Sequence, residues 1–150
     1  MVRRHAAMSG KDHPMNDNVT PTQKLAYVTP ETAKILKGRR EFFNYHDLGV
    51  TDATNGAMRA QVMKATEGLS QPTGWHYHVC DQQFIYMLKG WVDLVFEDGR
   101  QIRLKAGDSM MIPGGLRHNE LATSDEMDIL EVSVPAELGT VPCDPPAGHG

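Results

Sequence analysis

GWHYHVCDQQFIYMLKG, residues 74–90, holds the pattern from which the architecture of this 150-residue chain is predicted. His76 and His78 are two residues apart, so on a β-strand both imidazoles would point to the same side. Gln83 opens a second predicted strand, on which Ile85 and Met87 share its face. We therefore expect the two histidines and the Gln83 amide to approach one point inside a β-structure.

The predicted strand at residues 83–88 is apolar on both faces, because Phe84, Tyr86 and Leu88 alternate with Ile85 and Met87. A strand of a small barrel usually turns one polar face to water. Two apolar faces indicate either a second β-layer or a subunit interface, and we expect a homodimer.

Outward from this segment the chain consists of short apolar runs separated by turn residues, such as the Asp98-Gly99 pair that predicts a hairpin. Many short strands at even spacing indicate an all-β sandwich or barrel. The remaining predicted strands are residues 42–47, 57–65, 91–96, 101–105, 109–112, 117–121 and 127–134.

One helical signal precedes the strands. Thr29 suits a helix N-cap, Pro30 suits the first helical position and Gly38 suits the end, which predicts a short helix over Pro30–Lys37. We expect a disordered N-terminal tail over residues 1–24, a single domain over 25–138 and a flexible Pro- and Gly-rich tail over 139–150.

A second segment, GDSMMIPGGLRHNELA over residues 107–122, places His118 shortly after the turn Pro113-Gly114-Gly115. Residues 74–90 resemble the first motif of the cupin superfamily, G-x5-H-x-H-x(3,4)-E-x6-G, and residues 107–122 resemble the second, G-x5-P-x-G-x2-H-x3-N. The resemblance covers about residues 40–138. It implies a small type-2 cupin, whose fold is a double-stranded β-helix, or jelly-roll barrel.

The resemblance also implies a metal site on His76, His78 and His118, for one divalent transition metal ion among Zn, Mn, Fe, Ni and Co. Gln83 stands where the family usually has a glutamate ligand, and some cupins with glutamine here are thought to bind metal. A neutral amide cancels none of the ion's charge, so we expect weaker binding and a stronger Lewis acid. Ser70 and Ala122 replace two further motif residues.

Other residues near the motifs are weaker candidates. Glu131 lies on a predicted strand among apolar neighbours and could be a general base, a partner that orients a ligand, or a residue at the barrel rim. Arg117 and Glu120 flank His118 and could bind polar groups of a substrate, although surface exposure is the simpler expectation for both. Candidates for the wall of a substrate pocket, with core packing as the alternative, are Tyr77, Met87 and Met111.

The ligand set favours an enzyme that uses the metal as a Lewis acid, of isomerase or lyase type, on a sugar acid or a related oxygenated compound. An Fe(II)-type dioxygenase is one alternative. A non-catalytic sensor that binds a small ligand is another, from a different functional class. Fold and ligands alone do not identify a substrate.

Composition narrows the partners to a small molecule. Apolar residues make up 40% and charged residues 23%, as in ordinary globular proteins. The net charge of −4 and the lack of a basic stripe argue against nucleic acid. No apolar run approaches the ~18 residues that span a bilayer, and no apolar segment follows the first two arginines as in a secretory signal. We therefore expect a cytoplasmic protein without membrane partners.

Overall fold

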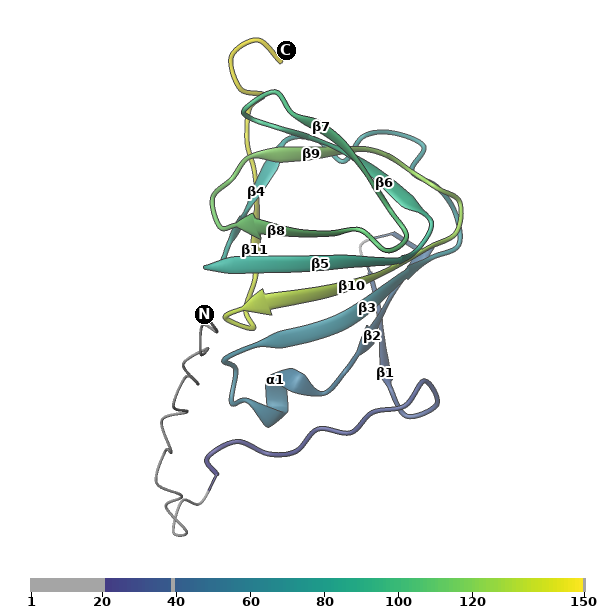
Figure 1. Cartoon of the computed structure of the whole chain (residues 1–150), viewed down its shortest axis with the longest axis vertical. Helices are drawn as coiled ribbons and strands as arrows, with labels where there is room; N and C mark the ends of the chain where they lie inside the picture. The colour runs from purple at the N-terminus through teal and green to yellow at the C-terminus, as the bar shows by residue number, and fades with distance from the viewer. Residues whose placement is uncertain (1–20, 39, 150) are drawn as a thin grey trace, which may run out of the picture.

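The computed structural model describes residues 21–38 and 40–149 (Figure 1). Most of the expected N-terminal tail, residues 1–20, lies outside this part. Within the described residues, no helix is long and apolar enough to cross a membrane.

The described strands form two antiparallel sheets. The first has six strands, in the order β1 (Lys34–Lys37), β2 (Phe43–Asp47), β3 (Arg59–Ala65), β10 (Met127–Val134), β5 (Gln82–Lys89) and β8 (Ser109–Pro113). The second has five, in the order β11 (Gly139–Pro142), β4 (His76–Val79), β9 (His118–Thr123), β6 (Trp91–Phe96) and β7 (Gln101–Lys105). Strands β6, β7 and β10 have the predicted bounds, and the all-β jelly-roll architecture is confirmed.

The two sheets face each other, with β6, β7 and β9 across from β5, β8 and β10 (Figure 1). Strand β5 shows how the sequence sets this up, because its residues alternate between exposed and buried from Gln82 to Met87. The inward side chains meet those of the opposite sheet in one core, which also fixes the strands of the candidate site. The core cluster consists of Ala65, Ile85, Met87, Val92, Leu94, Phe96, Leu104, Ile112, Met127 and Ile129.

The predicted helix over Pro30–Lys37 is wrong. The backbone makes one turn, in which the Ala33 N–H donates to the Thr29 carbonyl at 2.9 Å, and then continues as β1. Isolated helices of fewer than about 12 residues are marginal in water, whereas β1 gains four paired positions against β2. Among residues 21–38 and 40–149, the helix is the four-residue α1 (Val50–Ala53).

The predicted flexible tail from residue 139 also differs from the structure. Residues 139–142 form β11, which pairs with β4 and brings Thr140 opposite His78. Pairing with β4 at the edge of the sheet gives hydrogen-bond partners to the backbone of residues 139–142, which composition alone predicted to be mobile. This strand contributes directly to the candidate site.

Candidate metal centre

Three histidines from two neighbouring strands converge inside the barrel. His76 and His78 share a face of β4, and His76 lies directly opposite His118 on β9. Their ring centroids are 4.5 to 5.2 Å apart. One ring nitrogen from each residue lies within 4.8 Å of the other two. The three-histidine group expected from the two motifs is therefore assembled.

Hydrogen bonds hold each ring by its Nδ1 atom. His76 Nδ1 lies 2.7 Å from the Gly74 carbonyl oxygen, and His118 Nδ1 lies 2.9 Å from that of Leu116. A carbonyl oxygen only accepts, so each Nδ1 carries the proton and donates. His78 Nδ1 lies 3.1 Å from Thr140 Oγ1. The three Nε2 atoms are thereby turned to the interior, as in metal sites where an outer partner fixes the imidazole.

Two buried polar atoms point to a cation at this centre. Within the described part of the chain, Gln83 Oε1 and His118 Nε2 have no hydrogen-bond partner. Both residues are buried, with 7% and 0% of their surface exposed. Orphaned buried acceptors cost free energy, and a metal ion would satisfy both. The donor set of imidazole nitrogen and amide oxygen suits a divalent transition metal.

The second motif's turn is packed against the loop that follows the first motif. The Gly115 N–H donates to the His78 carbonyl at 2.9 Å, and the Gly114 N–H donates to the Asp81 carbonyl at 3.2 Å. These bonds fix where His118 begins β9 relative to His78 on β4.

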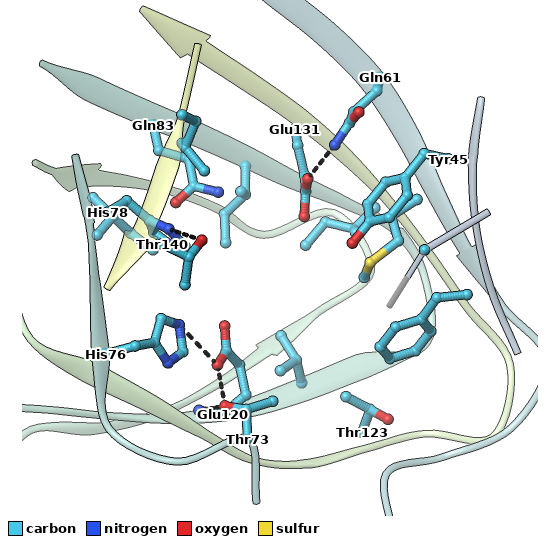
Figure 2. Close-up of a pocket in the computed structure, with 18 of the residues that line it drawn as sticks. Tyr45, Gln61, Thr73, His76, His78, Gln83, Glu120, Thr123, Glu131 and Thr140 are labelled. Carbon is cyan, nitrogen blue, oxygen red and sulfur yellow. Dashed lines mark hydrogen bonds and ion pairs between the residues drawn. The ribbon is translucent and has the colours of Figure 1, made fainter. Parts of the chain in front are cut away.

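Glu120 lies in the cavity, contrary to the expectation of a surface residue. It follows His118 by two residues on β9 and therefore shares the inward face. Glu120 Oε2 lies 3.4 Å from His76 Nε2 (Figure 2). Its Oε1 lies 3.9 Å from His118 Nε2. The Thr73 hydroxyl donates to Oε2 at 2.5 Å. Arg117 points elsewhere and pairs with Glu97 at 3.0 Å.

Electrostatics keep the site in a form that suits metal binding. Burial, with the neighbouring charges of His118 and His76, lowers the pKa of His78 to about 4. Burial likewise lowers the pKa of His118. Burial alone would raise the pKa of Glu120, but the hydrogen bond and charge of His76, with His118 and Thr73, bring it down to about 2. Neutral imidazoles at His78 and His118 and an ionised carboxylate at Glu120 are forms that bind metal ions.

A cavity of about 550 Å³ extends from the histidines between the two sheets. Gln61 and Glu131 lie opposite each other on β3 and β10, and the Gln61 amide donates to Glu131 Oε2 at 2.9 Å. They lie across the cavity from Glu120 (Figure 2). Burial raises the pKa of Glu131, against the opposing effects of the Gln61 hydrogen bond and the Arg59 charge. Other labelled lining residues are Tyr45, Thr123 and Thr140.

The three residues predicted to form a pocket wall do not line this cavity. Tyr77 alternates with the two ligand histidines on β4 and so faces the other way. Met87 is fully buried in the core, and Met111 is 55% exposed on β8. Glu120 was detectable from its parity with His118, whereas Gln61, Thr73 and Thr140 carry no motif signal.

Comparisons with known proteins agree with this architecture. Polyketide synthase CurC from Streptomyces cyaneus is 30% identical over 97 residues, which cover 65% of this chain and only 57% of CurC. The polyketide cyclase RemF from Streptomyces resistomycificus superposes with a TM-score of 0.60 at 21% identity, over 80% of this chain and 86% of RemF. KdgF from Halomonas sp. gives a TM-score of 0.60 at 16% identity, over 76% of this chain and 96% of KdgF.

The family assignment rests on sequence and fold together. The family model described as a cupin domain matches residues 64–134, which include both histidine motifs. The two solved structures are below 25% identity and support the fold alone. With its two-sheet barrel and its three-histidine group, the chain is a member of the cupin superfamily, and Gln83 replaces the usual glutamate of the first motif.

Proposed function

We propose that this protein is a metal-dependent enzyme of isomerase or lyase type that acts on a small oxygenated molecule. The observation that carries the proposal is the convergence of the inward ring nitrogens of His76, His78 and His118, each ring held from behind by its Nδ1 partner. Gln83 would add its amide oxygen to this set. A divalent ion held there would act as a Lewis acid towards a substrate carbonyl or hydroxyl group.

The cavity favours an extended, largely apolar substrate that carries several oxygen functions. Its walls include Phe43, Met63, Ile85, Leu94 and Ile129, and its volume falls in the usual range for drug-sized ligands. CurC, at 30% identity, is a polyketide synthase by name, which supports a polyketide-like substrate here.

A sugar acid is the second candidate substrate. Lys37, Arg40 and Arg59 also line the cavity, and a cationic side chain is what a substrate carboxylate needs. A polyketide-like substrate would therefore be bound mainly by the apolar lining residues, and a sugar acid mainly by the basic ones of the same cavity.

Glu131 is the proposed general acid. Because burial raises its pKa, this carboxyl group keeps its proton at a higher pH than an exposed glutamate and can give it to a substrate oxygen. The Gln61 amide, which donates to Glu131 Oε2, would then stabilise the carboxylate that remains. The acid would act from the side of the cavity opposite Glu120.

The first test is the metal content of protein purified without chelators, compared with His78→Ala. We expect about one divalent ion per chain in the parent and a large loss in the variant. Less than about a tenth of an ion per chain, with no gain on incubation with Zn²⁺, Mn²⁺, Fe²⁺, Ni²⁺ or Co²⁺, would reject the metal-dependent function.

The second test separates the substrate classes on the metal-loaded protein. Calorimetry with an aromatic 1,3-diketone and with galacturonate should give measurable heat for the diketone, and Glu131→Gln should retain binding. Binding of galacturonate alone would favour the sugar acid. Oxygen consumption by Fe²⁺-loaded protein would favour a dioxygenase, and ligand binding without turnover of any bound compound would favour a sensor.

We also propose that the outer face of β5 and β8 pairs with a second copy of this chain. Phe84, Tyr86, Leu88 and Met111 are 38–55% exposed there, and Met111 lies opposite Phe84 in the strand register. A contiguous exposed apolar patch on a sheet face is typical of an interaction site. Light scattering should give a dimer for the parent and a monomer for Tyr86→Glu; a monomeric parent would refute the pairing.

A further inference from the structure

Glu120 faces the ligand side of two of the three histidines. Its Oε2 lies 3.4 Å from His76 Nε2 and its Oε1 lies 3.9 Å from His118 Nε2. A side chain that merely oriented these imidazoles would contact Nδ1, but the Gly74 and Leu116 carbonyls already hold those atoms. Glu120 therefore approaches the atoms that would contact a metal ion.

The surroundings hold this carboxylate in place. The Thr73 hydroxyl donates to Glu120 Oε2, and the Thr73 N–H donates to the Glu120 backbone carbonyl at 2.9 Å. The side chain is 26% exposed and points into the cavity rather than to bulk water (Figure 2). The carboxylate accepts a hydrogen bond from His76 Nε2, and a cation that replaced this proton would lie beside the carboxylate and both imidazole nitrogens.

Strand β5, in the opposite sheet, lacks the charge that Glu120 supplies. Gln83 on β5 is neutral, and within the described residues its Oε1 atom has no hydrogen-bond partner. Without Glu120, three imidazoles and one amide would leave both positive charges of a divalent ion uncompensated. Glu120 approaches His76 and His118 of this centre from β9, on the opposite sheet from β5.

We propose that Glu120 is the anionic ligand of the metal centre, supplied by β9 in place of the carboxylate that β5 lacks. The proposal rests on the metal-dependent function above. It assigns one negative charge to the centre, so that a divalent ion retains a net charge of one. It also makes Thr73 a positioning residue, because Thr73 directs the Glu120 carboxylate towards the histidines.

The test measures metal affinity rather than activity. Zn²⁺ and Co²⁺ dissociation constants are determined by competition with a chromophoric chelator for the parent, Glu120→Gln and the control Glu126→Gln. The control removes the same charge from an exposed site, where Glu126 pairs with Lys89. We expect Glu120→Gln to weaken binding by about 10- to 100-fold or more and the control to leave it within about twofold. The metal-free melting temperature and circular dichroism show whether each variant is folded.

A charge relocation then distinguishes ligation from a general effect of charge. The double variant Gln83→Glu/Glu120→Gln returns the carboxylate to β5 and should recover most of the lost affinity. The visible spectrum of bound Co²⁺, which depends on coordination number, should change in Glu120→Gln and change back in the double variant. Thr73→Val should weaken binding less than Glu120→Gln does.

Three outcomes would overturn the proposal. Parent-like affinity in Glu120→Gln would refute ligation while leaving the three-histidine site intact. Weaker binding with an unchanged Co²⁺ spectrum would show that Glu120 acts only through its charge at a distance. Failure of the parent itself to bind any of the metals would refute the proposed function, and the ligand assignment with it.

Discussion

Replacing Gly114 by alanine should disturb the metal centre from outside it. Gly114 is not among the glycines with positive φ, so its backbone does not require glycine. Its Cα instead packs against the backbone of Cys80, and an added Cβ would overlap the Cys80 carbonyl oxygen and carbon. Cys80 follows His78 by two residues, and the turn that contains Gly114 leads into His118.

The size of the effect follows from what must move. Both overlapping groups are backbone, so no side-chain rotation relieves the contact, and the two segments must separate by more than about 1 Å. Overpacking of this kind costs about 1–3 kcal/mol, and we expect the upper end, which for about 150 residues lowers the melting temperature by roughly 6–12 °C. The Gly115–His78 hydrogen bond lies in the same contact, so metal affinity should fall on the order of 10- to 100-fold.

The matched control is Gly99→Ala in the turn between β6 and β7. Gly99 has a φ of +89° and nothing within 4 Å of an added Cβ, so the substitution adds backbone strain of about 1–2 kcal/mol without a clash. Its melting temperature should fall modestly while its metal affinity, measured by chelator competition, stays at the parent value. Parent-like stability and affinity in Gly114→Ala, or an equal loss of affinity in Gly99→Ala, would refute the reasoning.

Three further substitutions test the cavity and the core. Because burial raises the pKa of Glu131, the folded protein holds the proton of this carboxyl group more tightly than the unfolded chain does, and stability falls as pH rises through the folded pKa. In thermal melts, Glu131→Gln should therefore stabilise the protein more at pH 8 than at pH 5. An equal effect at both pH values would contradict this. Thr140→Val removes the hydroxyl partner of His78 Nδ1 and leaves the backbone hydrogen bond between His78 and Gly139. It should weaken Zn²⁺ binding by up to about tenfold, with an unaltered dissociation constant as the contrary result. Met87→Ala should cost about 2–5 kcal/mol in urea unfolding, and a loss below about 1 kcal/mol would show that the core collapses around the gap.

Local periodicity predicted most strands and placed His76 and His78 on one face, whereas the resemblance to the two cupin motifs added His118 and the metal site. The side-chain period of two places His76 with His78, and Gln83 with Ile85 and Met87, on one face whatever the partner strand. The same parity groups Glu131 with Met127 and Ile129 on one face of its strand, and it groups Glu120 with His118. Surface exposure is the simpler expectation for Glu120 because most carboxylates in proteins are exposed. That general tendency does not take account of the histidines that lie next to Glu120 in the folded chain.

The errors lie where pairing with a distant segment decides the structure. A helix-start signal at Thr29 and Pro30 predicted a helix, but β1 pairs with β2. Met111 was expected in the barrel, but its register on β8 turns it outward, where it is 55% exposed. Composition predicted a loose C-terminal end, but residues 139–142 join the free edge of β4.

The sequence by itself determined which side chains share a strand face, because the alternation of a β-strand is a property of the local backbone. Only the tertiary structure decided which faces meet. Thr140 reaches His78 across 62 residues, and Gln61 reaches Glu131 across 70. Such contacts depend on the register between strands far apart in the chain, and that register is set by packing of the whole core rather than by any short segment.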